Sequence, residues 1–367
     1  MRSRRRARTR ALTAVRPRCR TGCARVARRT AAARSSRSAL PPRRALVTVR
    51  VAIDALGGDR GPDEVVQGAL AAASDTVVPV IFGPAGLDTH GLELVATTDE
   101  IEMHEKPAEA VRGKPGASLV RAVRAVADGQ VDAVVSAGST GAMLAASLLY
   151  IRRLPGVHRP GIAVVIPSRR GPTVLIDAGA NADARPEHLV QFAHMGVVFA
   201  REILGVERPR VGLLSIGEEP EKGNALTLEA HALLAAAGHD FRGNVEPKTL
   251  LRGEVDVLVA DGFSGNVTLK TLEGAILGTV DALRHELLVD ARGKLAGLLM
   301  RPAARRVKAR LDPEATGGGY LLGLNGLVVI AHGSSSRVAI ANAVRMAARG
   351  VEHDVTAVLA RLLPARV

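Results

Sequence analysis

The 367-residue sequence has no tryptophan and only two cysteines. Both of these, Cys19 and Cys23, lie in residues 1–46, so the rest of the chain contains no thiol. This excludes a structural disulfide, a cysteine-rich metal site and a cysteine nucleophile from residues 47–367. Aromatic residues make up only 2% of the chain, too few for the stacking surfaces with which proteins bind single-stranded nucleic acid.

Acidic residues are missing from the beginning of the chain. Residues 1–46 contain sixteen arginines, no lysine and no acid, and the first carboxylate belongs to Asp54. This segment accounts for the formal net charge of +14, because the remainder has 34 basic against 36 acidic residues. We therefore expect no nucleic-acid partner for the folded part. Runs of 18 apolar residues are also missing, so we predict no membrane span and a cytoplasmic location.

The arginine-rich segment 1–46 is interpreted as lying outside the folded domain, which we predict to comprise residues 47–367. Its arginine and serine content resembles an organelle transit peptide, or a basic tail for anionic lipid or nucleic acid. The interpretation we favour is a start codon assigned too far upstream, with Val47 as the first residue of the protein. In each case we expect the segment not to pack against the domain.

Short β-branched apolar runs alternate with longer helical patterns after residue 47. The predicted strands are Val47–Ala55, Val77–Gly83, Asp132–Gly138, Thr173–Gly179, Arg210–Gly217, Asp256–Gly262 and Gly326–Gly333. The predicted helices include Pro62–Ser74, Ser118–Ala127, Glu187–Leu204, Leu226–Ala237 and Asn266–Leu288. Continuous apolar strands separated by helices predict an α/β fold, a three-layer α/β/α domain with a largely parallel sheet.

Six of these strands end in a small, polar, glycine-containing turn. The turns read DALGGD, SAGSTG, DAGAN, SIGEE, DGFSGN and AHGSSS in chain order. Ligands of open α/β sheets bind beyond the carboxyl ends of the strands. We therefore predict that the six turns converge on one cleft.

The turn SAGSTG, between a strand and a helix, is a candidate anion site. Gly138 and Gly141 let the backbone come close to an anion, and the hydroxyls of Ser139 and Thr140 can coordinate it together with free N–H groups of the helix. A simple helix cap is the alternative interpretation. The turn AHGSSS repeats the pattern, with His332 as a candidate phosphate donor or acid, or as a structural histidine.

Charged residues near the other turns have two interpretations each. A carboxylate repels phosphate, so Asp54 is expected to hold its glycine turn or to orient a lysine. With a helix beginning near Asn266, Lys270 lies one turn further along on the same side and could neutralise a phosphate; an exposed surface lysine is the alternative. Arg112 and Lys114 precede a predicted serine-capped helix and form a second possible anion clamp.

Several catalytic fingerprints are absent. No G-x-G-x-x-G follows a strand, no G-x-x-x-x-G-K-[ST] occurs, and GFSG is one residue short of the nucleophile elbow G-x-S-x-G. These absences argue against a dinucleotide enzyme, a P-loop kinase and a serine hydrolase. We therefore expect a site that positions phosphate rather than attacking the substrate itself.

Six ordered motifs resemble the PlsX family, the acyl-acyl-carrier-protein:phosphate acyltransferases of bacterial phospholipid synthesis. They are AIDALGGDRGP, VSAGSTGAMLA, LIDAGAN, LLSIGEEPEKGN, VADGFSGNVTLKTLEGA and LLGLNGLVVIAHGSSS. The resemblance runs from about Val47 to the C-terminal helix and leaves the arginine-rich segment outside. One position departs from it: Ser139 stands where the family usually has asparagine, and we expect activity to persist there with altered affinity.

The resemblance implies a homodimeric fold similar to phosphotransacetylase and isocitrate dehydrogenase. It implies that the enzyme transfers a long-chain acyl group from acyl carrier protein to inorganic phosphate, without a nucleotide, a metal or another cofactor. A membrane-bound glycerol-3-phosphate acyltransferase would use the acyl phosphate for phosphatidic acid. The alternatives are a phosphotransacetylase-like enzyme that uses acyl-CoA, a non-catalytic module that binds acyl chains or carrier protein, and a dehydrogenase of the related fold.

The hypothesis assigns site residues as follows. Lys270, His332 and Asn266 are the candidate catalytic residues. The residues predicted to bind phosphate or substrate are Asp54, Gly57, Gly58, Lys114, Gly138, Ser139, Thr140, Gly141, Asn181, Asp261, Gly265, Gly333 and Ser334.

The stretch Gly293–Leu311 combines apolar and basic residues on what the sequence suggests are adjoining short helices. Leu295, Leu298, Leu299 and Met300 stand beside a run of five basic residues. Such a pattern suits contact with an anionic bilayer, and the resemblance favours peripheral membrane association. A dimer-interface helix and a docking surface for acidic carrier protein are the alternatives.

Overall fold

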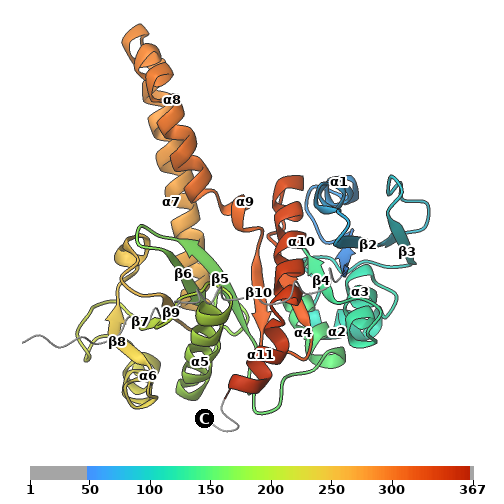
Figure 1. The fold of residues 1–367 in the computed structure, drawn as a ribbon, viewed down its shortest axis with the longest axis horizontal. Helices are drawn as coiled ribbons and strands as arrows, with labels where there is room; N and C mark the ends of the chain where they lie inside the picture. The colour runs from blue at the N-terminus through green and yellow to red at the C-terminus, as the bar shows by residue number, and fades with distance from the viewer. Residues whose placement is uncertain (1–47, 364–367) are drawn as a thin grey trace, which may run out of the picture. The chain divides into compact units, whose positions relative to one another are not determined.

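The computed structural model describes residues 48–363 (Figure 1); the expectations for segment 1–46 therefore lie outside the described residues. Eleven strands form one sheet in the order β3-β2-β1-β4-β11-β10-β5-β6-β9-β7-β8. The strands are β1 (Val49–Asp54), β2 (Val77–Pro84), β3 (Glu93–Thr97), β4 (Ala133–Ser136), β5 (Gly161–Pro167), β6 (Pro172–Ile176), β7 (Arg210–Leu214), β8 (Asp240–Val245), β9 (Val257–Val259), β10 (Gly319–Leu322) and β11 (Leu327–Ile330).

Helices cover both faces of the sheet, as the sequence predicts. On one face lie α1 (Pro62–Ala72), α5 (Pro186–Glu202), α6 (Ala225–Ala236), α10 (Arg337–Glu352) and α11 (Val355–Leu362). On the other lie α2 (Pro107–Gly113), α3 (Ser118–Ala127), α4 (Thr140–Tyr150) and the first part of α7 (Gly262–Val289). Two short elements, the 3-10 helix Pro247–Arg252 and α9 (Pro313–Thr316), complete the connections.

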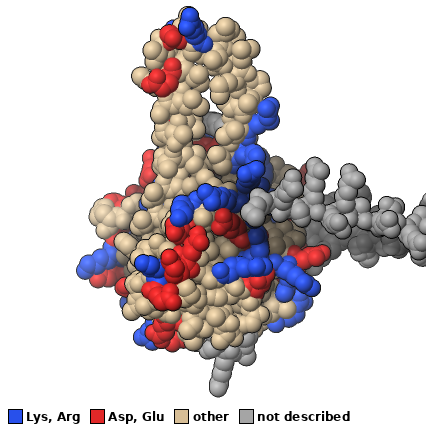
Figure 2. Space-filling model, turned by 90° about the vertical axis from the view of Figure 1, so that its left-hand side faces the viewer, with Lys and Arg blue, Asp and Glu red and all other residues tan. Residues whose placement is uncertain are grey.

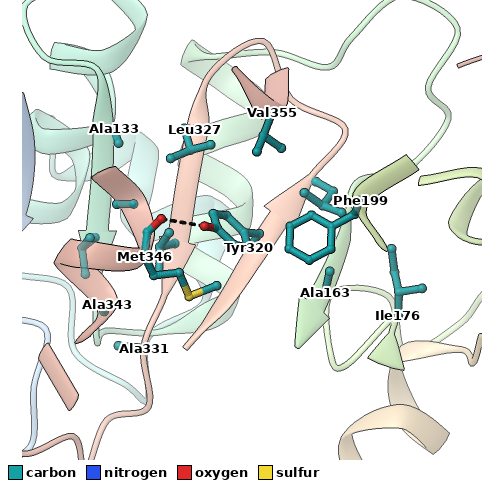
Figure 3. Packing of buried hydrophobic residues seen from close by; sticks show 14 of the residues in the cluster. Ala133, Ala163, Ile176, Phe199, Tyr320, Leu327, Ala331, Ala343, Met346 and Val355 are labelled. Carbon is teal, nitrogen blue, oxygen red and sulfur yellow. Dashed lines mark hydrogen bonds between the residues drawn. The ribbon is translucent and has the colours of Figure 1, made fainter. Parts of the chain in front are cut away.

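Successive side chains of each strand point to opposite faces of the sheet, so the core consists of two hydrophobic clusters, one on each face. In β6, for example, Val174 and Ile176 face one cluster and Leu175 faces the other, and all three are fully buried. This is the period of two that a strand covered on both sides requires. Figure 3 shows part of the first cluster, in which the Tyr320 hydroxyl of β10 donates a 2.6 Å hydrogen bond to the carbonyl of Met346 in α10.

The sheet consists of two parallel blocks that run in opposite directions. Strands β3, β2, β1, β4 and β11 are parallel to one another, and so are β6, β9, β7 and β8. Between the blocks, β10 and β5 are antiparallel to each neighbour, which reverses the direction of the second block relative to the first. The turns after β1, β4 and β11 therefore end strands of one direction, and those after β6, β7 and β9 end strands of the opposite direction. The register places Ile330 of β11 and Leu175 of β6 in one row of the sheet, so the two groups of turns begin only a few residues apart along the strands. Their convergence on one cleft stays a prediction.

All seven predicted strands and five predicted helices form, with ends that shift by a few residues. The strands that the pattern missed are β3, β5, β8 and β10. Of these, β3 and β8 are edge strands with several exposed or half-exposed positions, and β10 is only four residues long. Such strands have too few apolar residues to stand out as a continuous apolar run. Only β5 contains such a run, which the sequence prediction omitted.

Helices α7 and α8 (Ala291–Leu311) form a long antiparallel hairpin that extends away from the sheet (Figure 1). Where the sequence suggested short helices, α8 is one helix of 21 residues that contains Pro302. The side chain of Asp290 caps α8 by accepting a hydrogen bond from the backbone of Gly293 at 2.6 Å. Asp290 is thus the single residue between α7 and α8.

Candidate active site

Asp54, the last residue of β1, is the centre of the first group of turns. Its carboxylate accepts hydrogen bonds from the hydroxyls of Ser118 at 2.5 Å and Ser136 at 2.7 Å. Burial raises the pKa of Asp54, and the hydrogen bonds from the two serines oppose that shift. Of the two roles expected for this carboxylate, the structure shows the one in which it holds the turns. Ser118 is thus a hydrogen-bond partner of Asp54 and not the cap of α3, which has no side-chain cap.

The glycines of these turns allow three backbone segments to meet. A Cβ atom on Gly57 would lie 2.6 Å from the backbone nitrogen of Gly138 and 2.6 Å from a carboxylate oxygen of Asp54. Close by, the backbone of Asp59 donates a 2.9 Å hydrogen bond to the carbonyl of Gly333. The turns DALGGD, SAGSTG and AHGSSS therefore form one cluster, which we call the β1–β4–β11 turn cluster. Gly58 also belongs to it, next to Gly333 and Ala137.

Helix α4 begins inside this cluster. Ser139 is its N-cap and accepts a hydrogen bond from the backbone of Ala142 at 3.4 Å. The capping interpretation is thus observed, and it leaves the first-turn N–H groups of Thr140 and Gly141 without helical partners, because no preceding turn supplies a carbonyl. This hydrogen bond uses a lone pair of the Ser139 oxygen, so the hydroxyl hydrogen of Ser139 stays available to donate to a ligand. An anion can bind here beside the cap.

His332 follows β11 and is exposed at the same cluster. Its Nδ1 lies 3.3 Å from the backbone nitrogen of Ser334 and 2.9 Å from the hydroxyl oxygen of Ser334. A backbone N–H can only donate, so Nδ1 carries a lone pair and the proton of the neutral ring is on Nε2. His332 therefore offers an Nε2–H donor to a ligand.

Lys114 is engaged elsewhere. Its Nζ lies 2.6 Å from the carboxylate of Glu105 and donates a 3.1 Å hydrogen bond to the carbonyl of Glu100. The neighbouring carboxylate of Glu105 raises the pKa of Lys114. The structure thus gives Lys114 a local partner on the loop before α2, in place of the free anion clamp that the sequence suggested.

The second group of turns is organised by Asp177. This fully buried carboxylate accepts hydrogen bonds from the backbone of Ile162, Gly179 and Ala180, and from both the backbone and the side chain of Asn181. The side-chain amide of Asn181 also donates to the carbonyl of Pro160 at 2.8 Å. Asn181 therefore holds the turn and presents no free amide hydrogen to a ligand.

Helix α7 begins against this second group. The side chain of Asp261 caps it by accepting a hydrogen bond from the backbone of Ser264 at 2.9 Å. A Cβ atom at Gly265 would overlap the carbonyl oxygen of Asp177, so only glycine fits at this contact. The helix starts four residues earlier than predicted, at Gly262, which places Asn266 in its second turn. The side chain of Asn266 lies against Gly179.

Helix α7 connects the two groups. Partly buried Leu269 and Leu272 pack against the hydrophobic cluster that contains Val328 and Ile330 of β11. Further along α7, burial raises the pKa of Glu273, and the charges of His332 and Lys270 lower it. His332 and Lys270, two of the predicted catalytic residues, thus belong to one electrostatic environment, whereas Asn266 lies at the second group of turns, beside Gly179.

Sequence reasoning did not include Glu273, Ser118, Ser136 or Asp177 among the site residues. From sequence alone, a single carboxylate inside a helix, such as Glu273, is interpreted as an exposed side chain. The role of Ser118 and Ser136 becomes visible only in the structure, where both hydroxyls contact Asp54. Glu273 had one available signal, because it lies seven residues after Asn266 and three after Lys270 and therefore shares their helix face.

Among residues 48–363, no His, Cys, Asp and Glu side chains form a group of three or more that could hold a metal. Within the same residues, no helix is both long enough and apolar enough to cross a bilayer.

Solved structures of other proteins share the fold. Similar solved structures include a phosphotransacetylase from Streptococcus pyogenes, with a TM-score of 0.53 and 17% identity, covering 83% of this chain and 94% of that chain. A branched-chain phosphotransacylase from Enterococcus faecalis V583 has a TM-score of 0.53 and 19% identity, covering 83% of this chain and 100% of that chain. The expected similarity to the phosphotransacetylase fold is confirmed.

The sequence comparisons define the family. A family model described as "Fatty acid synthesis protein" matches residues 49–358. The chain is 43% identical over 331 residues to a phosphate acyltransferase from Heliobacterium modesticaldum, covering 87% of this chain and 99% of the relative. It is 45% identical to that of Thermosynechococcus vestitus, covering 85% and 94%. The chain belongs to this family of phosphate acyltransferases, the PlsX family.

Proposed function

We propose that the enzyme transfers a long-chain acyl group from acyl carrier protein to inorganic phosphate. The observation that supports this most directly is the β1–β4–β11 turn cluster. It gathers two free helix N–H groups, the hydroxyls of Ser139 and Thr140, and the Nε2–H of His332, all of them donors suited to a phosphate. Asp54 stays behind these donors because Ser118 and Ser136 engage its oxygens.

In this proposal the bound phosphate is the nucleophile. One of its unprotonated oxygens attacks the thioester carbonyl, and the C–S bond breaks as the acyl–oxygen bond forms. The proton that hydrogen phosphate carries ends on the thiolate, so acyl thioester and HPO₄²⁻ give a thiol and acyl phosphate dianion. The protein contributes position and charge: Lys270 neutralises the phosphate, and His332 donates from Nε2 to the developing oxyanion.

Among the remaining proposed ligands, Gly57, Gly58, Gly138, Gly141 and Gly333 keep the backbone open around the phosphate. Asp261, Gly265 and Asn181 act indirectly, because they fix the start of α7. Lys114 would reach the site only by leaving Glu105. We assign Asn266 a position along the path of the acyl thioester and not a contact with phosphate.

We further propose that the distal half of the α7–α8 hairpin contacts an anionic membrane surface. Leu295, Leu298, Leu299 and Met300 are exposed there, with 74% of Leu299 accessible to solvent. Four arginines, Arg301, Arg305, Arg306 and Arg310, follow in the direction of the sheet. Figure 2 shows blue side chains near the base of the hairpin, a largely tan middle part, and both red and blue side chains at the tip. An exposed apolar stretch followed by a basic segment suits a bilayer interface.

This location would release acyl phosphate where a membrane-bound glycerol-3-phosphate acyltransferase could use it. We also propose a homodimer, as the family resemblance implies, with cytoplasmic enzyme in exchange with the membrane. A flotation assay with vesicles containing phosphatidylglycerol tests the membrane contact. The double variant Leu298→Glu/Leu299→Glu should stay in the unbound fraction; binding equal to that of the unchanged protein would remove the proposal.

An enzyme that uses acyl-CoA is the second candidate, because the fold is shared with phosphotransacetylases. The two are separated by mixing the full chain with palmitoyl-ACP or palmitoyl-CoA and inorganic phosphate, and trapping acyl phosphate as the hydroxamate. We expect phosphate-dependent product with the carrier-protein thioester. Product from the CoA thioester alone would favour the second candidate, and no product from either would contradict both.

A further inference from the structure

Glu273 is a partly buried carboxylate with no hydrogen-bond or ion-pair partner among residues 48–363. Most buried or partly buried carboxylates accept hydrogen bonds, because desolvation without a donor is costly. The two buried carboxylates of the turn groups follow this rule. Asp54 accepts from two serine hydroxyls, and Asp177 accepts from four backbone N–H groups and an amide.

The position of Glu273 follows from its helix. Asn266, Lys270 and Glu273 are separated by four and three residues, so they share one face of α7. On the adjoining face, Leu269 and Leu272 hold the helix against the hydrophobic cluster that includes Ile330. Two residues after Ile330 the chain reaches His332. The Glu273 carboxylate thus lies near Lys270, the cation that we assign to the phosphate, and near His332, the hydrogen-bond donor.

A carboxylate next to a phosphate site would weaken binding unless the ligand itself donates a hydrogen bond. Hydrogen phosphate, HPO₄²⁻, has one P–OH group and can donate. Sulfate has the same size and charge near neutral pH but carries no proton. An ionised carboxylate accepts hydrogen bonds only, so it attracts the first anion and repels the second.

We propose that Glu273 selects phosphate over sulfate by accepting the hydrogen bond that the P–OH group of hydrogen phosphate donates. This rests on the proposed function, which places phosphate at the β1–β4–β11 turn cluster. Lys270 then neutralises the anion and His332 donates a hydrogen bond from its own side, while Glu273 orients the phosphate with its protonated oxygen turned toward α7. The attacking oxygen is one of those without a proton.

The test compares Glu273→Gln and Glu273→Ala with the unchanged full chain and with Glu286→Gln, a control at an exposed position on the same helix. At pH 8, binding of phosphate, arsenate and sulfate is measured as ligand-dependent thermal stabilisation, and sulfate is tested as an inhibitor of turnover. The unchanged protein and the control should bind phosphate and arsenate, which can donate, in preference to sulfate. In both Glu273 variants, the ratio of the affinity for phosphate to the affinity for sulfate should fall by about tenfold or more.

A preference unchanged in both Glu273 variants would overturn the proposal, as would tight sulfate binding by the unchanged protein. The thermal measurement needs no acyl donor, so it separates this result from failure of the proposed function, which would appear as absence of acyl phosphate from either thioester. The alanine variant serves where glutamine perturbs packing, and folding is checked through the melting temperature without ligand.

Discussion

Gly57 and Gly138 lie so close together that a Cβ atom on Gly57 would come within 2.6 Å of the backbone nitrogen of Gly138. This contact joins the turn after β1 to the turn that starts α4. Gly57→Ala should therefore force the two turns apart, lower the free energy of unfolding by about 1–3 kcal/mol and reduce phosphate binding. Melting temperature and phosphate KM are the measurements.

Gly113→Ala provides the matched control for that substitution. Gly113 ends α2, and nothing lies within 4 Å of the position its Cβ would take. Its variant should melt within a few degrees of the unchanged protein. Equal effects of the two substitutions would show that the contact between Gly57 and Gly138 has no special importance.

The two predicted lysine ligands should behave differently. Lys270→Gln removes a cation near His332 and Glu273 and should raise the KM for phosphate by about tenfold or more. Lys114→Gln removes the partner of Glu105 and should change that KM less than twofold. Initial rates over a range of phosphate concentrations decide this, and a larger effect at Lys114 would reassign the cation of the site.

Ser139→Asn tests the departure from the family pattern. Asparagine is as good an N-cap as serine, so the melting temperature should change little. An amide N–H₂ group replaces one hydroxyl hydrogen at the start of α4, so we expect the phosphate KM to change, with kcat retained within about threefold. A loss of kcat with an unchanged KM would place residue 139 beside the acyl group and not beside the phosphate.

His194 and His239 should make stability fall in weak acid. The Nε2 of His239 lies 2.8 Å from the Nδ1 of His194, and burial lowers the pKa of His194 to about 4 and also lowers that of His239. The unfolded chain therefore binds more protons than the folded one between about pH 6.5 and 4. Stability from His194 is complete above about pH 6.5 and is lost, by about 3 kcal/mol at most, as the pH falls toward 4.

Urea unfolding between pH 7.5 and 4 measures this loss. His194→Gln should flatten the curve relative to the unchanged protein, because glutamine does not titrate. His104→Gln, at an exposed loop position, serves as the control and should leave the slope as it was. Parallel curves for all three proteins would contradict the assignment.

Sequence patterns predicted the layers of the fold because strands buried on both faces need continuous apolar residues, as Val134 and Leu175 illustrate. They could not predict the direction of the second block of strands. That reversal depends on β5 and β10, and short Gly319–Leu322 has no signal that distinguishes parallel from antiparallel pairing. The phosphate turns were found as local motifs, whereas the partners of Asp54 came from residues 64 and 82 positions away.

Reversal of the sheet gives the two halves of α7 different tolerance to insertions. Ile330 and Leu175 lie in one row of the sheet through Gly319 and Val164, so His332 and Asp177 are about four residues, or roughly 13 Å, apart along the strands. The eight residues from Gly265 to Glu273 rise about 12 Å. One residue added in that interval would turn Glu273 by about 100° away from His332. Beyond Leu277, the same insertion would leave Glu273 and His332 in place and change only the hairpin, so length variation among related chains should be confined to its distal part.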